Sequence, residues 1–110
     1  MKKETIESIY NADFYKQQAQ LSYQSATFIL EYLKGVLPNL KSVIDVGCGV
    51  GTWLKAWKDL NPKIQIAGID GNSVDEKYYW IPLSSYAEVN LTQPCANLLK
   101  QITSHFAPPQ

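Results

Sequence analysis

The feature that most constrains the fold of this sequence is a β-branched run that ends in three glycines at alternate positions, in SVIDVGCGVGTW, residues 42–53. Val43, Ile44 and Val46 are typical of a parallel strand buried on both faces, because such strands are apolar without alternation. Glycines let the backbone turn sharply and approach a ligand that a Cβ atom would keep away. The helix expected after the turn directs its free N–H groups to the same place. The segment therefore predicts a strand, a glycine loop and a helix that together form a ligand site.

The spacing of the glycines narrows the class of ligand. Gly47, Gly49 and Gly51 form G-x-G-x-G, whereas the dinucleotide-binding fingerprint is G-x-G-x-x-G. Asp45 stands just before the loop, and a carboxylate there disfavours a pyrophosphate. Both observations argue against a nicotinamide-binding dehydrogenase. A ligand with a cationic ammonium and an adenosine, such as S-adenosylmethionine, suits an acidic strand end better.

A second apolar segment, residues 64–70, also reads as a buried strand that ends in a carboxylate. Asp70 lies 19 positions after Gly51, close to the interval of about 20 residues at which an acidic residue meets ribose hydroxyls. A carboxylate only accepts hydrogen bonds, and it has room for both hydroxyl donors of a ribose diol. Residues 86–91 are predicted to form a third strand that again ends in a polar residue.

These segments resemble the class I S-adenosylmethionine-dependent methyltransferases. VIDVGCGVGTW is similar to the first motif of that family, AGIDGN to the second, and YAEVNLTQP to the third, with Asn90 where the family usually carries Asp. The resemblance covers residues from about 10 to 95 and only the cofactor half of the fold. It implies an α/β fold, a Rossmann-like three-layer sandwich with a mainly parallel sheet, truncated after about three strands because the sequence ends before a fourth would begin.

The resemblance also implies roles for individual residues. Gly47 and Gly49 would line the methionine portion of S-adenosylmethionine, and Asp45 would hold its ammonium, directly or through water. Asp70 would bind the ribose. The full set of implied cofactor-binding residues is Asp45, Gly47, Cys48, Gly49, Gly51, Thr52, Trp53, Asp70, Gly71, Asn72, Asn90 and Leu91.

Several of these residues have alternative interpretations. Gly71 would leave space beside the adenine, Leu91 would present its backbone N–H to the ring, and Asn90 would face the adenine amino group. Asn90 is equally suited to open a turn, since asparagine favours turns by itself. Cys48 is expected to be a small buried residue. Trp53, with a second tryptophan one turn later, is more typical of a helix core than of a cofactor contact.

Composition sets further bounds. The 110 residues form one domain, and ten acidic residues balance ten lysines, so no electrostatic footprint for nucleic acid is present. Arginine, the usual bidentate clamp for anions, is absent from the sequence. The two cysteines are too few for a disulfide framework, the lone His105 is expected at the surface, and no metal-ligand spacing occurs. No signal peptide or membrane span is visible, so we expect a cytoplasmic protein.

The remaining segments are predicted from periodicity. Residues 1–12 are polar and are expected to be poorly ordered, and the aromatic cluster at 78–80 is expected to pack beneath its loop more than to line a pocket. Residues 72–79 are expected to form a loop with one helical turn. The predicted helices are one from Tyr15 or Gln18 to Gly35 with Ala26, Ile29, Leu30, Leu33 and Leu37 on one face, one after the glycine loop with Trp53, Leu54 and Trp57 on the sheet, and one over residues 95–106 with Leu98, Leu99 and Ile102 inward.

Two functions follow as alternatives. The first is methyl transfer from S-adenosylmethionine to an acceptor that the sequence does not identify. The second is a module that binds the cofactor, or another partner, without chemistry of its own, because no side chains form a convincing acid–base pair and no catalytic residue can be named. Without a fourth strand, residues 43–46 would form an open sheet edge, and we expect self-association or a partner chain across it.

Overall fold

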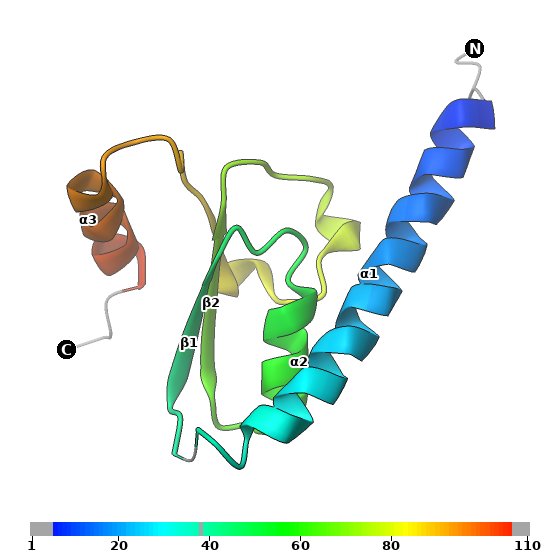
Figure 1. The fold of residues 1–110 in the computed structure, drawn as a ribbon. Helices are drawn as coiled ribbons and strands as arrows, with labels where there is room; N and C mark the ends of the chain where they lie inside the picture. The colour runs from blue at the N-terminus through cyan, green and yellow to red at the C-terminus, as the bar shows by residue number, and fades with distance from the viewer. Residues whose placement is uncertain (1–5, 38, 107–110) are drawn as a thin grey trace.

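The computed structural model describes the backbone of residues 6–37 and 39–106, and side chains from residue 12 onward within these ranges. The described elements are α1 (Ile6–Leu33), β1 (Ser42–Val46), α2 (Thr52–Leu60), β2 (Gln65–Asp70), η1 (Glu76–Tyr78), η2 (Leu83–Ser85), β3 (Tyr86–Glu88) and α3 (Cys95–Phe106) (Figure 1). The two η elements are single turns of 3₁₀-helix.

The strands form a parallel sheet in the order β1-β2-β3. Val43 lies opposite Ile66 and Asp45 opposite Gly68, and Ile69 lies opposite Ala87 in the next pair. The predicted α/β fold with a parallel sheet is therefore confirmed. The third strand is shorter than predicted, because the chain leaves the sheet after Glu88.

Helices cover both faces of this sheet (Figure 1). On one face, Leu54 of α2 is fully buried against Cys48 and Ile81. Helix α1 packs on the outer side of α2 through Ala26 and Leu30. On the other face, α3 covers a cluster of buried residues on β2, β3 and the residue that follows β3, namely Ile69, Ala87 and Val89.

Helix α1 differs from the sequence prediction in its start and in its buried face. It begins at Ile6 instead of Tyr15 or Gln18, so part of the segment expected to be poorly ordered has a helical backbone, while residues 1–5 lie outside the described residues. The predicted apolar face was too wide. Ile29 is 42% exposed, because α1 packs on the single helix α2 and only a narrow stripe of its surface is covered. Leu37, 45% exposed, lies beyond the end of the helix at Leu33.

The predicted inward faces of the other two helices, α2 and α3, also differ in part from the structure. Trp53 and Trp57 pack against the α1–α2 cluster instead of the sheet, because α1 covers the outer side of α2, and only Leu54 covers the strands as predicted. Helix α3 has the predicted bounds, and Leu98 and Ile102 face inward, but Leu99 is 63% exposed.

Among the described residues, no helix has both the length and the apolar character needed to cross a membrane.

The absence of a side chain at Gly68 is required for α2 to sit on the sheet. A Cβ atom there would lie 2.7 Å from Cys48 Sγ and 2.8 Å from Leu54 Cδ1. We therefore expect Gly68→Ala to lower the free energy of unfolding by about 1–3 kcal/mol through overpacking, measured by urea denaturation. Gly71→Ala is the matched control, since its nearest neighbour, the Val89 carbonyl oxygen, lies at an ordinary 3.7 Å. Equal stabilities for the two variants would contradict this account.

Candidate functional site

The glycine loop connects β1 to α2 and folds back on β2. Gly47, Gly49 and Gly51 have φ angles of 79°, 57° and 86°, in the left-handed region that favours glycine. The N–H groups of Gly47 and Cys48 both donate to the Ile69 carbonyl oxygen, at 2.7 and 3.0 Å. The loop is therefore held by the carboxyl end of β2 as well as by its own turn.

The three glycines differ in what surrounds them. A Cβ atom at Gly51 would lie 2.7 Å from Ile81 Cγ1, so this position is closed by packing within the protein. At Gly47 and Gly49 a Cβ atom would meet no atom within 4 Å. These two glycines therefore lie beside open space, and the protein itself leaves room there for a ligand to approach the backbone.

Asp70 links the glycine loop to the segment after β2. One of its carboxylate oxygens accepts the Gly49 N–H at 2.9 Å, and the other accepts the Asn72 N–H at 3.0 Å. A carboxylate has about four acceptor sites, so each oxygen retains one after these bonds. Asp70 thus has a structural role that the sequence interpretation missed, and it keeps the capacity to accept two hydroxyl donors.

Asp45 lies near Asp70 at the end of the neighbouring strand. Burial raises the pKa of Asp45, and the negative charge of Asp70 raises it further. Burial and the charges of both carboxylates also raise the pKa of Cys48 to about 11. Cys48 is buried, as the sequence predicted, and its thiol is neutral at physiological pH and unsuited to act as a nucleophile.

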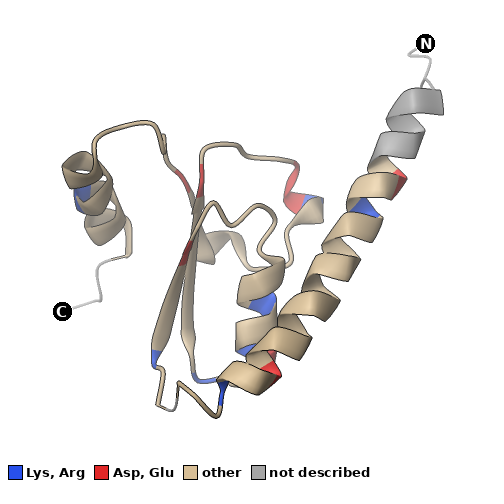
Figure 2. Ribbon diagram, viewed as in Figure 1, with Lys and Arg blue, Asp and Glu red and all other residues tan. Residues whose placement is uncertain are grey.

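Acidic side chains gather at the carboxyl ends of the strands. Asp45 is the penultimate residue of β1, while Asp70 and Glu88 are the last residues of β2 and β3. Lys41 and Lys63 precede β1 and β2 at the opposite ends (Figure 2). The glycine loop therefore lies at the negatively charged end of the sheet, where the carboxyl ends of the strands meet.

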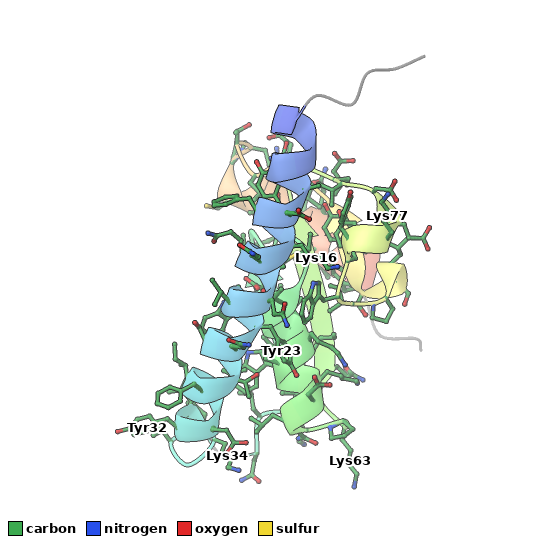
Figure 3. All side chains as sticks on the ribbon, turned by 90° about the vertical axis from the view of Figure 1, so that its right-hand side faces the viewer. Lys16, Tyr23, Tyr32, Lys34, Lys63 and Lys77 are labelled. Carbon is green, nitrogen blue, oxygen red and sulfur yellow. The ribbon has the colours of Figure 1, made fainter. Side chains whose placement is uncertain are left out.

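A large open cavity of about 1430 Å³ lies beside the loop, bounded by α1, β1, the start of α2 and the segment 74–80. Lys16 on α1 and Lys77 on η1 are among its lining residues, and both are labelled in Figure 3, which shows the molecule from the α1 side. Of the sequence candidates, it is lined by Asp45, Gly47, Cys48, Gly49, Thr52 and Trp53. The candidates outside its lining are Gly51, Asp70, Gly71, Asn72, Asn90 and Leu91. The structure thus gathers the methionine-side candidates in one cavity, and the ribose and adenine candidates lie outside its lining.

The segment after β2 closes over the loop. The Trp80 N–H donates to the Val50 carbonyl oxygen at 2.8 Å, and the Trp80 ring lies 5.1 Å from the ring of Tyr23 on α1. Tyr79 packs on Tyr86 at 4.8 Å, in keeping with the predicted packing role. Trp80 packs as predicted and also lines the cavity, whereas Tyr78 lines the cavity and is 45% exposed, so for Tyr78 the packing prediction was wrong.

Helix α1 supplies one wall of the site, and no motif in the sequence pointed to it. Residues of α1 between Ala12 and Ser22 line the cavity. Ser22 Oγ lies 2.8 Å from Oγ1 of Thr52, a buried residue at the first turn of α2. Thr52 therefore fixes α1 over the loop in addition to lining the cavity. The predicted helical periodicity of α1 was the only sequence signal for this wall.

Asn90, which follows β3, opens a turn, as its alternative interpretation predicted. The Asn90 side-chain oxygen accepts the Thr92 N–H at 2.9 Å and the Thr92 hydroxyl at 2.5 Å. Leu91 packs against the Ile69 cluster under α3. Within residues 12–37 and 39–106, no group of three or more His, Cys, Asp or Glu side chains is placed to hold a metal ion.

Comparison of the chain with protein-family models, with curated proteins and with solved structures found no match.

The raised pKa of Asp45 gives a test of the electrostatics. Because the folded chain holds this proton to higher pH than the unfolded chain, stability falls as the pH rises from the ordinary carboxyl value of 3.8 through the raised pKa. Asp45→Asn is expected to be more stable than the wild type at neutral pH, and the difference should vanish in acid below the ordinary value. Urea unfolding at a series of pH values measures this.

The matched control is Glu88→Gln, an isosteric change of an exposed carboxylate at the end of β3. It should change the free energy of unfolding by less than about 0.5 kcal/mol. A gain from Asp45→Asn that does not depend on pH would contradict the assigned cause.

Proposed function

We propose that the chain binds S-adenosylmethionine at the carboxyl ends of β1 and β2, as the cofactor-binding part of a Rossmann-like class I methyltransferase. One observation carries the proposal. Two carboxylates on adjacent parallel strands flank a glycine loop whose Gly47 and Gly49 lie beside open space. Open α/β sheets place ligands outside the carboxyl ends of their strands.

The charge of the site supports a cationic ligand over a phosphate. A helix N-terminus alone would attract an anion. Here Asp45 and Asp70 lie beside it, and each disfavours further negative charge. Burial raises the pKa of Asp45, and the charge of Asp70 raises it further. S-adenosylmethionine carries an ammonium and a methyl-bearing sulfonium, and the chemistry it supplies is an electrophilic methyl group. Both positive charges of the cofactor are favoured at this acidic end of the sheet.

The residues fit the parts of the cofactor as follows. Asp45 is available to the ammonium, since it lines the cavity together with Gly47 and Gly49. Asp70 retains one acceptor site on each oxygen for the ribose hydroxyls after bracing the loop. Adenine would lie beside Gly71, an exposed residue. Asn90 already uses its side-chain oxygen in a turn, which favours a contact through its other groups.

The alternative, binding without chemistry by this chain, has an observation in its favour. Apart from Asp45 and Cys48, the described groups with shifted pKa values have structural roles outside the cavity lining. Tyr23 and Lys55 both bond to Asp59 where α1 meets α2, and the Tyr86 hydroxyl donates to the Asn72 carbonyl oxygen. Methyl transfer depends mainly on positioning an acceptor against the sulfonium, which these groups do not do. We therefore expect cofactor binding with negligible turnover when the 110-residue chain is assayed with a panel of acceptors.

Isothermal calorimetry with S-adenosylmethionine and S-adenosylhomocysteine tests binding directly. Gly49→Val is expected to abolish it, because the added side chain fills the open space beside the loop. Asp70→Ala is expected to weaken it by ~1.5–3 kcal/mol, the usual worth of hydrogen bonds to a charged group.

Gly49→Asn separates occlusion from backbone strain. Asparagine tolerates the left-handed conformation of this position better than other residues with a Cβ atom, so the variant should fold while its side chain still occupies the ligand space. Circular dichroism and urea unfolding verify the fold. NAD serves as the ligand control and should bind more weakly, because its pyrophosphate meets two carboxylates. Undetectable binding by the wild type, or full binding by a folded Gly49→Asn variant, would overturn the proposal.

A further inference from the structure

The outer side of β1 presents unpaired backbone groups. The Gln65 N–H donates to the Lys41 carbonyl oxygen, and the Gly47 N–H donates to Ile69, so alternate residues from 41 to 47 face β2. The backbone groups of Ser42, Ile44 and Val46 consequently face away from it. In the part of the chain that the structure describes, β2 is the one strand paired with β1. This side of β1 is a free template for another strand.

The exposed edge is also apolar. Ile44 is 49% exposed and Val46 55% exposed, on the face of the sheet that α3 covers elsewhere. Helix α3 packs over β2 and β3 and leaves these two side chains uncovered. Natural sheet edges are protected by charges, prolines or bulges. The one charged residue of β1 is Asp45, whose side chain lies on the other face, with Val43.

We propose that β1 pairs antiparallel with β1 of a second copy of the chain, about a two-fold axis at Val43, so that the two three-stranded sheets become continuous. In this register Lys41 of one copy lies opposite the partner's Asp45, and the same pair recurs across the axis. A two-fold arrangement closes the interface with one surface used twice.

Charge complementarity selects this register among those that the backbone allows. Outward-facing groups can pair only if Ser42, Ile44 and Val46 meet residues of the same set or Leu40. With Val43 on the axis, Ser42 meets the partner's Ile44 and Val46 meets the partner's Leu40. A shift of two residues places Asp45 opposite the partner's Val43, and a shift of four places it opposite the partner's Asp45, where like charges repel.

The charges involved are free to pair. Both ion pairs of the described residues use other groups, Lys34 with Glu31 and Lys55 with Asp59. Lys41 is exposed. Asp45 is partly buried near Asp70, and neither of these two ion pairs includes it. Directly opposite side chains on adjacent strands have Cβ atoms about 4.5–5.5 Å apart, within reach of an ion pair. The partner's lysine would therefore offset the charge of a carboxylate that is costly to bury.

A charge-swap experiment tests the register, with size-exclusion chromatography and light scattering and without any cofactor. Lys41→Glu places like charges opposite each other twice in a homodimer, and so does Asp45→Lys. Each variant alone is expected to raise the dissociation constant about tenfold or more. An equimolar mixture of the two is expected to restore dimers, because each glutamate or aspartate then faces a lysine at all contacts.

The mixture is its own folding control, since recovery requires both variants to be folded. Ile44→Lys should also prevent association, while Phe28→Lys, a matched loss of an exposed apolar side chain on α1, should leave it intact. A wild type that stays monomeric at every concentration overturns the proposal, as does a mixture that stays monomeric. Because no cofactor is present, these outcomes are independent of S-adenosylmethionine binding.

Discussion

The parallel pairing of β1 with β2 determines the geometry of the whole site. The register that sets Asp45 opposite Gly68 brings the glycine loop to the carboxyl end of β2, where it donates two hydrogen bonds to Ile69 and one to Asp70. Gly68 has no side chain, and this leaves the space in which Cys48 and Leu54 seat α2 on the sheet. The position of the loop, the start of α2 and the closeness of the two carboxylates all follow from this single strand pair.

Local signals were sufficient to predict this part of the fold. β-Branched runs and glycine spacing predicted the order strand, loop, helix and strand, and each of the first two apolar runs was predicted to end beside a carboxylate, Asp45 and Asp70. The bounds of α3 also followed from its periodicity. In each case the residues that determine the structure are neighbours in sequence, so tertiary packing did not have to be known.

The parts that could not be predicted depend on contacts between distant segments. The tryptophans of α2 turn from the sheet because α1 covers that side of the helix, and nothing near them in sequence encodes α1. The same contact leaves Ile29 exposed, since one neighbouring helix buries only a narrow stripe. Asn90 shows why the role of a polar side chain could not be predicted from its residue type. Its residue type fits both a turn and an adenine contact, and only the position of Thr92 shows that the side-chain oxygen is already used.

Asp45 connects the two proposals through its charge. Its carboxylate is partly buried near Asp70, and any cation brought close to it lowers the free energy of its ionised form. The cofactor's ammonium would approach from the cavity beside the glycine loop, whereas the partner's Lys41 would approach across the free edge of β1. Both cations stabilise the same negative charge, so the presence of one reduces the favourable free energy that the other gains by approaching Asp45. Linkage makes this effect reciprocal: if cofactor binding weakens pairing of the edge by some factor, pairing must weaken cofactor binding by the same factor. The two proposals therefore couple the exposed edge of the sheet to the proposed ligand site through one side chain.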